Sequence, residues 1–272
     1  MATAFSDLRH PLIGDGYNWQ KEKEVEKEVM GVEPILKAEH LAISFGSNHV
    51  LKDINFELGD NETLGIIGPN GAGKTVMLNI ITGILKPTGG QVIYQGKDIT
   101  KTKITERVKI GIGRTFQVPR AFEKMSAFEN VITGGIFGSG LSEHEAAKKA
   151  EEILELIGMI DKADVDAGKL GLLDRKRLEI GIALSSDPKI LLFDEVAGGL
   201  TESEIDDILE IVRVLKERGL SILWIEHVIQ TMLHGTDRVL LLADGRDIIC
   251  GKPEEVMASK EVEEVYLGVR KK

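Results

Sequence analysis

The sequence predicts an α/β fold built on a mainly parallel sheet with helices on both faces. From about Ile35 onward, short apolar runs alternate with segments of helical periodicity. Strands that alternate with helices of this length form parallel sheets that are buried on both sides. A chain of 272 residues can bury a substantial core, so we expect one domain with an insertion or two tightly joined lobes.

Short apolar segments locate the expected strands. The first two, residues 35–45 and 54–58, are joined through the turn-rich GSNH, as turn residues between two apolar runs indicate. Four further runs predict short strands: TLGIIG (63–68), KILLFD (189–194), SILWI (221–225) and RVLLLA (238–243).

Three other segments have helical spacing. The first is MLNIITGIL, residues 77–85. The second, residues 141–158, gathers Ala146, Ala150, Ile153 and Ile157 on one face. The third begins with a capping box of Thr201 and Glu204 and ends at Gly219. Its apolar stripe consists of Ile205, Ile208, Leu209, Val212 and Leu215.

The composition argues against several classes of protein. The hydrophobic content of 42% and the charged content of 29% are typical of a soluble globular protein. The longest apolar run, Val239–Ala243, has five residues, whereas a membrane-spanning helix needs about 20. No secretory signal is visible and Cys250 is the lone cysteine, so we expect a reducing cytoplasm and a buried thiol. The net charge of -10 disfavours a nucleic-acid partner.

Residues 1–33 differ from the rest of the chain. Their segment QKEKEVEKEVMG carries little apolar surface. We therefore interpret residues 1–33 as a charged, solvated N-terminal extension, with a binding arm as the alternative.

A phosphate-loop pattern, GPNGAGKT, occupies residues 68–75 between an expected strand and an expected helix. Its glycines allow the backbone to wrap around phosphate, and the helix start adds its positive end. Lys74 would reach the β and γ phosphates, and Thr75 would offer its hydroxyl to Mg2+. A chance match in a Gly-rich turn is the alternative. The predicted nucleotide-binding residues here are Gly68, Pro69, Asn70, Gly71, Ala72, Gly73, Lys74, Thr75 and Val76.

Two adjacent carboxylates, Asp194 and Glu195, end the apolar run KILLFDE. Ligands of parallel sheets gather at the carboxyl ends of the strands, where the metal of a phosphate-loop site also lies. Asp194 would hold Mg2+ through water, and Glu195 would orient or deprotonate the attacking water. The alternative is that both acids are simply solvated where the strand leaves the core.

With these motifs the sequence resembles the nucleotide-binding subunits of ABC transporters over residues 35–268. The phosphate loop, the strand ILLFDE, the Gln of GRTFQ and the His of LWIEH occur in the family's order and rough spacing. The resemblance implies a P-loop NTPase fold of ABC type, with an antiparallel β lobe and an inserted helical lobe over about 118–180. It also implies an ATPase domain over residues 34–272 that binds ATP and Mg2+ and hydrolyses ATP.

The resemblance assigns roles to further residues. Gln117 matches the residue that senses Mg2+ and the attacking water, which makes Thr75, Gln117 and Asp194 the predicted metal site. His227 matches the switch histidine at the γ phosphate, so Glu195, His227 and Gln117 are the predicted catalytic residues. Read alone, Gln117 would be an ordinary loop residue and His227 a structural one.

Phe45 resembles the aromatic residue on which adenine stacks in the family. It precedes the GSNH turn at the end of an expected strand. Its alternative role is core packing, because a Phe at a strand end is usually buried.

The chain departs from the family's Leu-Ser-Gly-Gly-Gln signature, which binds the ATP held by the opposite subunit. This signature segment reads Leu-Gly-Leu-Leu-Asp over residues 170–174. Gly171 lacks a hydroxyl, Leu173 adds bulk and Asp174 adds negative charge, so we expect one of two composite sites to be slow. Val196 and Thr201 also depart from the family's common residues. The basic run Arg175–Arg177 that follows is expected to be a solvated helix face, with a phosphate or partner contact as the alternative.

Four sequence segments are similar to those of the branched-chain amino-acid importer group: GRTFQVPRAFEKMSAFENV, LLDRKRLEI, DEVAGGLTESE and EEVYLG. By resemblance, such a subunit lies on the cytoplasmic face of the membrane. It pairs with a second, related ATPase, the alternative being a homodimer, and with two permeases that a solute-binding protein supplies. Residues 120–130 would line the groove for a permease helix. An envelope-lipid exporter ATPase and a soluble regulatory ATPase are the alternative functions, and urea, short amides or aromatic acids are alternative solutes.

Overall fold

The computed structural model describes residues 33–267, and residues from Pro34 onward form one compact unit. Residues 1–32 lie outside the described range. The charged extension expected over residues 1–33 therefore stays a prediction, as does the boundary at residue 34.

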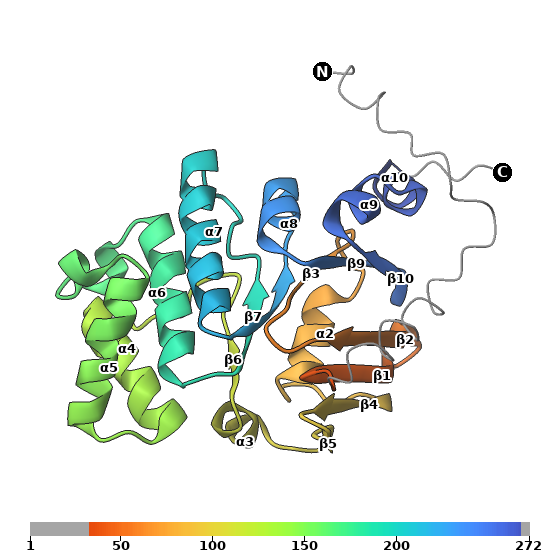
Figure 1. Cartoon of the computed structure of the whole chain (residues 1–272). Coiled ribbons are helices and arrows are strands. Elements are labelled where there is room, and N and C mark those ends of the chain that lie inside the picture. The colour runs from red at the N-terminus through yellow and green to blue at the C-terminus, as the bar shows by residue number, and fades with distance from the viewer. Residues whose placement is uncertain (1–32, 268–272) are drawn as a thin grey trace. The chain divides into compact units, whose positions relative to one another are not determined.

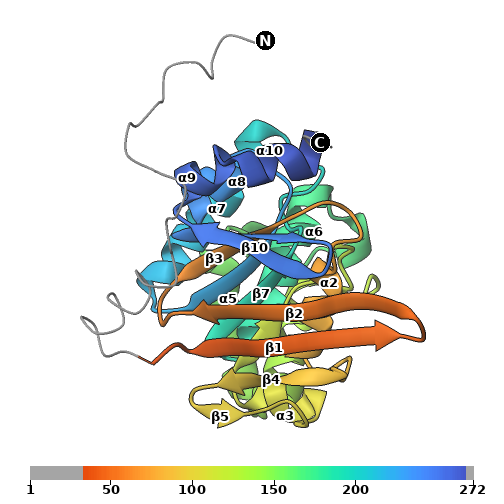
Figure 2. The ribbon, with the colours of Figure 1, turned by 90° about the vertical axis from the view of Figure 1, so that its right-hand side faces the viewer.

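Ten strands within the described range form one sheet (Figures 1 and 2). They are β1 Leu36–Phe45, β2 Asn48–Leu58, β3 Thr63–Ile67, β4 Gly89–Tyr94, β5 Lys97–Asp98, β6 Ile112–Arg114, β7 Ile190–Asp194, β8 Ser221–Ile225, β9 Arg238–Ala243 and β10 Arg246–Gly251. Their order is β5-β4-β1-β2-β10-β9-β3-β8-β7-β6. The pairs from β9 to β6 are parallel, whereas β1, β2, β4 and β5 pair antiparallel. The predicted parallel core with an antiparallel β lobe is confirmed.

Helices connect these strands and cover the sheet. The α-helices are α2 Lys74–Ile81, α3 Ile104–Lys109, α4 Ala127–Gly134, α5 Glu143–Leu156, α6 Leu172–Ser185, α7 Glu202–Glu217, α8 Ile229–Gly235, α9 Pro253–Met257 and α10 Lys260–Leu267. Three short segments of other helix types are η1 Gly135–Ser139, η2 Ile160–Lys162 and η3 Ala167–Lys169. In the chain, α4, α5 and α6 all fall between β6 and β7, and they pack against one another (Figure 1). No helix in the described part of the chain is long and apolar enough to span a membrane.

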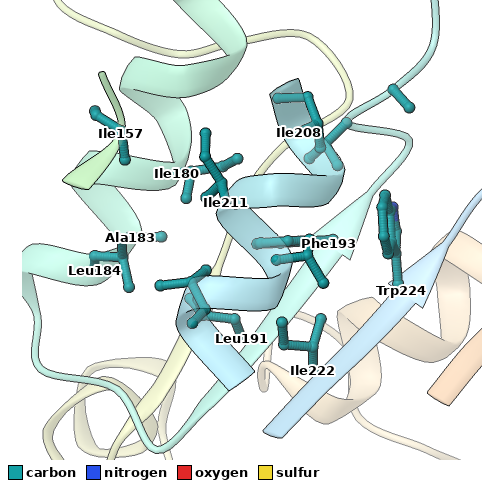
Figure 3. Packing of buried hydrophobic residues seen from close by; sticks show 14 of the residues in the cluster. Ile157, Ile180, Ala183, Leu184, Leu191, Phe193, Ile208, Ile211, Ile222 and Trp224 are labelled. Atoms are coloured by element: carbon teal, nitrogen blue, oxygen red, sulfur yellow. The ribbon is translucent and has the colours of Figure 1, made fainter. Parts of the chain in front are cut away.

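The core lies on both faces of the sheet. On one face, Leu191 and Phe193 of β7 and Ile222 and Trp224 of β8 pack against α6 and α7 (Figure 3). The rings of Phe193 and Trp224 meet edge to face at 5.8 Å. On the other face, a second buried cluster joins α2 to the antiparallel strands. Because both faces of the central strands are covered, β3, β7 and β8 are buried along their whole length, which explains their unbroken apolar sequence.

Helix α7 follows its predicted sequence signals closely. The Thr201 hydroxyl accepts a hydrogen bond from the backbone N–H of Glu204, and the Glu204 side chain bonds back, forming the capping box. Gly219 has a φ of +82° just beyond the helix end. One detail of the predicted stripe differs, because Ile211 is buried whereas Leu209 is only half-buried.

Cys250 is half-buried in β10, rather than fully buried as predicted. Its sulfur accepts a hydrogen bond from Arg238 Nη2 at 3.2 Å. The polar partner explains why the thiol does not lie in the apolar core.

Three parallel strands end at the same edge of the sheet. Ile66 of β3 is paired with Ile225 of β8, which is paired in turn with Asp194 of β7. The residues that follow these strands are therefore neighbours, although they are far apart in the sequence. This edge carries the phosphate loop, the paired carboxylates and the histidine that the sequence singles out.

Candidate active site

The phosphate loop connects β3 to α2, as predicted. Gly68 has a φ of +153°, and a Cβ there would lie 2.0 Å from the Leu242 carbonyl oxygen. Gly73 has a φ of +102°, and a Cβ there would lie 2.4 Å from the Leu51 side chain. No larger residue fits either position. Gly73 caps α2 without a side-chain hydrogen bond, which leaves the first N–H groups of the helix available to an anion.

The remaining loop residues differ in their exposure to solvent. Asn70, Gly71 and Thr75 are exposed, Pro69 and Val76 are half-buried, and Ala72 is buried. The Ala72 N–H donates to the Pro69 carbonyl at 3.2 Å and closes the turn. The hydroxyl-bearing residue of the motif therefore lies on the open side of the loop.

Lys74 lies inside the loop. Its residue is 6% exposed, and its Nζ donates to the Gly68 carbonyl at 2.6 Å and to the Pro69 carbonyl at 3.1 Å. Burial lowers the pKa of the Lys74 ammonium, and the charges of Glu195 and Asp194 oppose this shift. Two of the three ammonium donors bond to the loop, so the third can serve a ligand. Lys74 is also close enough to both acids to interact with them electrostatically.

Asp194 ends β7 and is nearly fully buried. Its Oδ2 accepts a hydrogen bond from Arg114 Nη2 at 2.8 Å, and Arg114 Nη1 donates to Asn79 of α2 at 2.6 Å. Its Oδ1 is buried and has no hydrogen-bond partner among the described residues. A buried carboxylate oxygen without a partner is costly unless a ligand meets it, so this atom is suited to a cation or its bound water.

Glu195 is held by two of the predicted residues. Gln117 Nε2 donates to Glu195 Oε2 at 2.5 Å, and His227 Nε2 lies 3.0 Å from Glu195 Oε1. If the carboxylate is ionised, the histidine nitrogen is the donor. The Glu195 backbone adopts the left-handed region with a φ of +52°, which is uncommon for a residue with a side chain and often marks a functional site. The structure thus brings together the three predicted catalytic residues from three separate segments.

Phe45 lies at the end of β1 and is 50% exposed. Core packing, the alternative for this residue, is therefore wrong. Val118 and Phe122, on the loop that follows Gln117, are also exposed. The adenine contact predicted for Phe45 and the permease contact predicted for residues 120–130, which include Phe122, stay predictions.

The structure contradicts the expectation that Arg175, Lys176 and Arg177 form a solvated face. Lys176 is 3% exposed, and its Nζ donates to the backbone carbonyls of Gln117 at 3.0 Å and Glu195 at 2.8 Å. Arg175 donates to the carbonyls of Leu170 and Gly168, and Arg177 forms an ion pair with Asp207 of α7. Lys176 is buried and the two arginines are half-buried, and each cation has backbone or carboxylate acceptors.

Two buried carboxylates near the site were missed by sequence reasoning. Glu179 of α6 accepts hydrogen bonds from the N–H groups of Phe116 and Arg120. Glu226, after β8, accepts from the N–H groups of Ala197 and His227. Burial raises the pKa of both carboxyl groups, and these backbone hydrogen bonds oppose the shift. Both acids thus hold the loops that carry the predicted catalytic residues.

The spacing of residues along α6 gives a partial indication of its buried polar face. Lys176 lies four residues before the buried Ile180 and seven before the buried Ala183, which places all three on one face. Arg177 has the same spacing to two other buried residues of α6 but is only half-buried, so the pattern alone does not single out Lys176. The two carboxylates lack any comparable local signal, because their partners are backbone N–H groups of other segments.

The signature segment forms the start of α6, with Gly171 as its N-cap. Leu172 is 46% exposed, whereas Leu173, the residue expected to obstruct this end, is half-buried against the core. Asp174 accepts a hydrogen bond from Lys162 Nζ at 2.7 Å, so its charge is compensated inside the subunit. The bulk at the helix start therefore comes from Leu172.

Comparisons with known proteins identify the family. A family model described as ABC transporter matches residues 51–198. The chain is 32% identical to the high-affinity branched-chain amino acid transport ATP-binding protein LivG of Escherichia coli, covering 87% of this chain and 98% of that protein. It is also 32% identical to the lipopolysaccharide export system ATP-binding protein LptB of Haemophilus influenzae, covering 86% and 97%. The ADP conformation of MJ1267, an ATP-binding cassette of an ABC transporter, matches with a TM-score of 0.79 and 32% identity over 87% of this chain and 99% of that one.

Proposed function

Since the chain belongs to the ABC transporter family as an ATP-hydrolysing subunit, we propose that it energises uptake of a small solute through the site at the sheet edge. The solute we propose is a branched-chain or other hydrophobic amino acid. The observation that carries the catalytic part of the proposal is the Glu195 carboxylate held between Gln117 and His227.

Glu195 is the group that activates water in this proposal. Its carboxylate accepts a proton from the water as the water oxygen attacks the γ phosphorus of ATP, while the bond to the β–γ bridging oxygen breaks. Gln117 and His227 fix the orientation of the carboxylate before the reaction. In the imidazolium form of His227, its Nδ1–H is available to donate to the γ phosphate while Nε2–H holds Glu195.

The phosphate loop binds the triphosphate. Its backbone N–H groups and the start of α2 face the phosphate oxygens, and Lys74 neutralises the β and γ phosphates. Lys74 is already held in the loop by two carbonyls, so only a small movement is needed to reach a ligand. Phe45, being exposed, offers its ring to the adenine.

Mg2+ fits the residues present. The unpartnered Oδ1 of Asp194 and the exposed Thr75 are oxygen ligands of the kind that Mg2+ prefers, and Gln117 adds a third. Within residues 33–267, no cluster of three or more His, Cys, Asp or Glu could hold a metal alone, as expected for an ion that shares its ligands with a phosphate. When bound, Mg2+ neutralises charge on the β and γ phosphates.

Turnover of wild-type protein compared with Glu195→Gln tests the catalytic assignment. Phosphate release that needs Mg2+ and falls strongly in the variant supports it. Full turnover by the variant contradicts it.

The partners follow from the family resemblance. We propose a peripheral location on the cytoplasmic face of the membrane and a pair with a second, related ATPase, or with a second copy, on two permeases. The helical lobe, proposed to span residues 118–180 of an ATPase domain over 34–272, would contact a permease through residues 120–130. The exposed Phe122 and Val118 support this surface.

The second candidate function is export of an envelope lipid, because the chain is as similar to LptB as to LivG. Copurification of the native complex from membranes, followed by identification of its permeases, distinguishes the two. Amino-acid permeases with an extracytoplasmic binding protein support import, and lipid-export permeases overturn it.

A further inference from the structure

The Lys176 ammonium is part of a closed ring of hydrogen bonds with Gln117 and Glu195. Lys176 Nζ donates to the backbone carbonyl of Gln117 at 3.0 Å and to that of Glu195 at 2.8 Å. The side chains of the same two residues bond to each other at 2.5 Å. One buried cation therefore fixes the backbones of both residues whose side chains meet in the site.

The surroundings of Lys176 are strongly acidic and closed to solvent. Lys176 is 3% exposed, so it cannot touch a nucleotide directly. The carboxylates of Glu226, Glu195, Glu179 and Asp194 all interact with its charge. The Lys176 cation offsets the repulsion among these acids. Because the donor is charged and buried, its hydrogen bonds to the two carbonyls are strong.

Helix α6 holds the Gln117 loop at further points. Glu179, three residues after Lys176, accepts from the N–H groups of Phe116 and Arg120 on either side of Gln117. The loop is thus attached to one face of α6 by an anion at its flanks and by a cation at its centre. Movement of α6 would carry Gln117 with it.

The Glu195 backbone needs such support. Its φ of +52° is uncommon for a residue with a side chain and persists where the surrounding structure fixes it. Its N–H donates to the Ile225 carbonyl at 2.9 Å, and its own carbonyl accepts from Lys176. This carbonyl also accepts from the Gly198 N–H at 3.3 Å, but Lys176, at 2.8 Å, is the donor that joins it to α6.

We propose that Lys176 is a positioning residue for ATP hydrolysis, which holds Gln117 and Glu195 in their reactive arrangement and joins both to helix α6. This inference rests on the proposed roles of Glu195 and Gln117. It extends them, because α6 begins at the signature segment, and Lys176 lies four residues, about one turn, after Leu172. A displacement at the start of α6 thereby reaches both residues through a single side chain.

The test compares Lys176→Met and Lys176→Arg with wild-type full-length protein. Met keeps the length of the side chain but donates no hydrogen bond, whereas Arg keeps the cation. We expect Lys176→Met to lower kcat for ATP by about 10- to 100-fold, the range for a lost charge-assisted hydrogen bond, with KM nearly unchanged. Lys176→Arg should restore part of the loss. Lys149→Met is the matched control, because Lys149 pairs with Asp187, which is 81% exposed, at the surface.

A double-mutant cycle separates positioning from a general effect on the fold. In a Gln117→Ala background, Lys176→Met should cost less than it does in wild-type protein, because the two residues act as one unit. The inference is overturned if the fold-loss in kcat of the double mutant equals the product of the two single-mutant losses. It is also overturned if Lys176→Met leaves kcat unchanged. If Lys176→Met does not fold, Lys176→Gln, which keeps a hydrogen-bond donor, takes its place in the test. If neither variant folds, Lys176 has a structural role and the inference is overturned.

Glu195→Gln in the same assay distinguishes this inference from the proposed function. A fully active Glu195→Gln contradicts the catalytic assignment itself. An inactive Glu195→Gln beside a normal Lys176→Met leaves the proposed function standing and removes only the role of Lys176.

Discussion

At the scale of single residues, the site depends on carboxylates in unlike surroundings. Asp194 is buried, bonded to Arg114 through one oxygen and unpartnered at the other. Glu195 is the next residue, but its left-handed backbone turns its side chain toward Gln117 and His227. Two adjacent acids can therefore serve a metal and a water separately, because the backbone between them changes direction.

Glu195→Gln should lower kcat by about 100-fold or more, the range for removal of a general base, while ATP binding is retained. The amide keeps the shape of the side chain but cannot accept a proton. Phosphate release measures turnover, and binding of a fluorescent ATP analogue measures affinity. Glu217→Gln, an exposed carboxylate of α7, is the control and should behave like wild-type protein.

Arg107→Met should lower the free energy of unfolding by about 3 kcal/mol or more, because several buried acceptors lose a charged donor. Arg107 is 1% exposed and donates to five backbone carbonyls, including those of Ile80 and Ile81 at the end of α2. Urea unfolding measures the change. The exposed Arg213→Met is the control, and an equal, small effect of both substitutions would contradict a role of Arg107 in holding α2.

At the scale of elements, the sequence predicted the features that depend on contacts between residues close together in the chain. The capping box of α7, the turn at Gly219 and the phosphate loop were predicted because each depends on residues within a few positions of one another. The buried positions of Lys176 and Arg107 and the hydrogen bond of the half-exposed Tyr266 were not predicted. Their partners are backbone atoms 59, 27 and 198 residues away, and a backbone carbonyl or N–H leaves no trace in the sequence.

Helix α10 supports the phosphate loop through Tyr266. The Gly68 N–H donates to the Tyr266 hydroxyl at 3.0 Å. Tyr266→Phe keeps the ring but removes this acceptor, so we expect ATP binding to weaken by about 1 kcal/mol, a few-fold in Kd. Equilibrium titration measures the change, with Glu264→Gln on the same helix as control. An unchanged Kd would show that the loop is held without α10.

At the scale of the whole molecule, the site combines residues that precede and residues that follow a long helical insertion between β6 and β7. Helices α4, α5 and α6 lie in the chain between β6 and β7, so the segment with Gln117 leaves the sheet before them and the segment with Glu195 returns after them. The antiparallel lobe carries Phe45, the predicted adenine contact, and contributes the other face of the core. The parallel direction of the central strands, and the position of the site at the sheet edge formed by their carboxyl ends, were predictable from the alternation of elements. The packing of α6 against that edge was not, because the basic run at its start resembles a solvated face.

The predicted asymmetry between the two ATP sites can be tested only in the assembled transporter. Leu172 is exposed at the start of α6, where the family's signature would approach a second subunit's ATP. In the reconstituted complex we expect Glu195→Gln here to lower ATP turnover at least about 10-fold more than the matching change in the partner ATPase, the lower bound for one lost charge-assisted hydrogen bond. Equal losses from the two changes would contradict an asymmetric pair.

Binding of Mg-ATP to the purified chain tests the central claim most directly, that the glycine loop holds a triphosphate beside Asp194 and Glu195. Calorimetric titration should show saturable binding by wild-type protein and by Glu195→Gln. It should show at least about 10-fold weaker binding by Lys74→Met, because a charged donor to the phosphates is lost. Absence of binding by folded wild-type protein, or equal affinity in Lys74→Met, would contradict the claim.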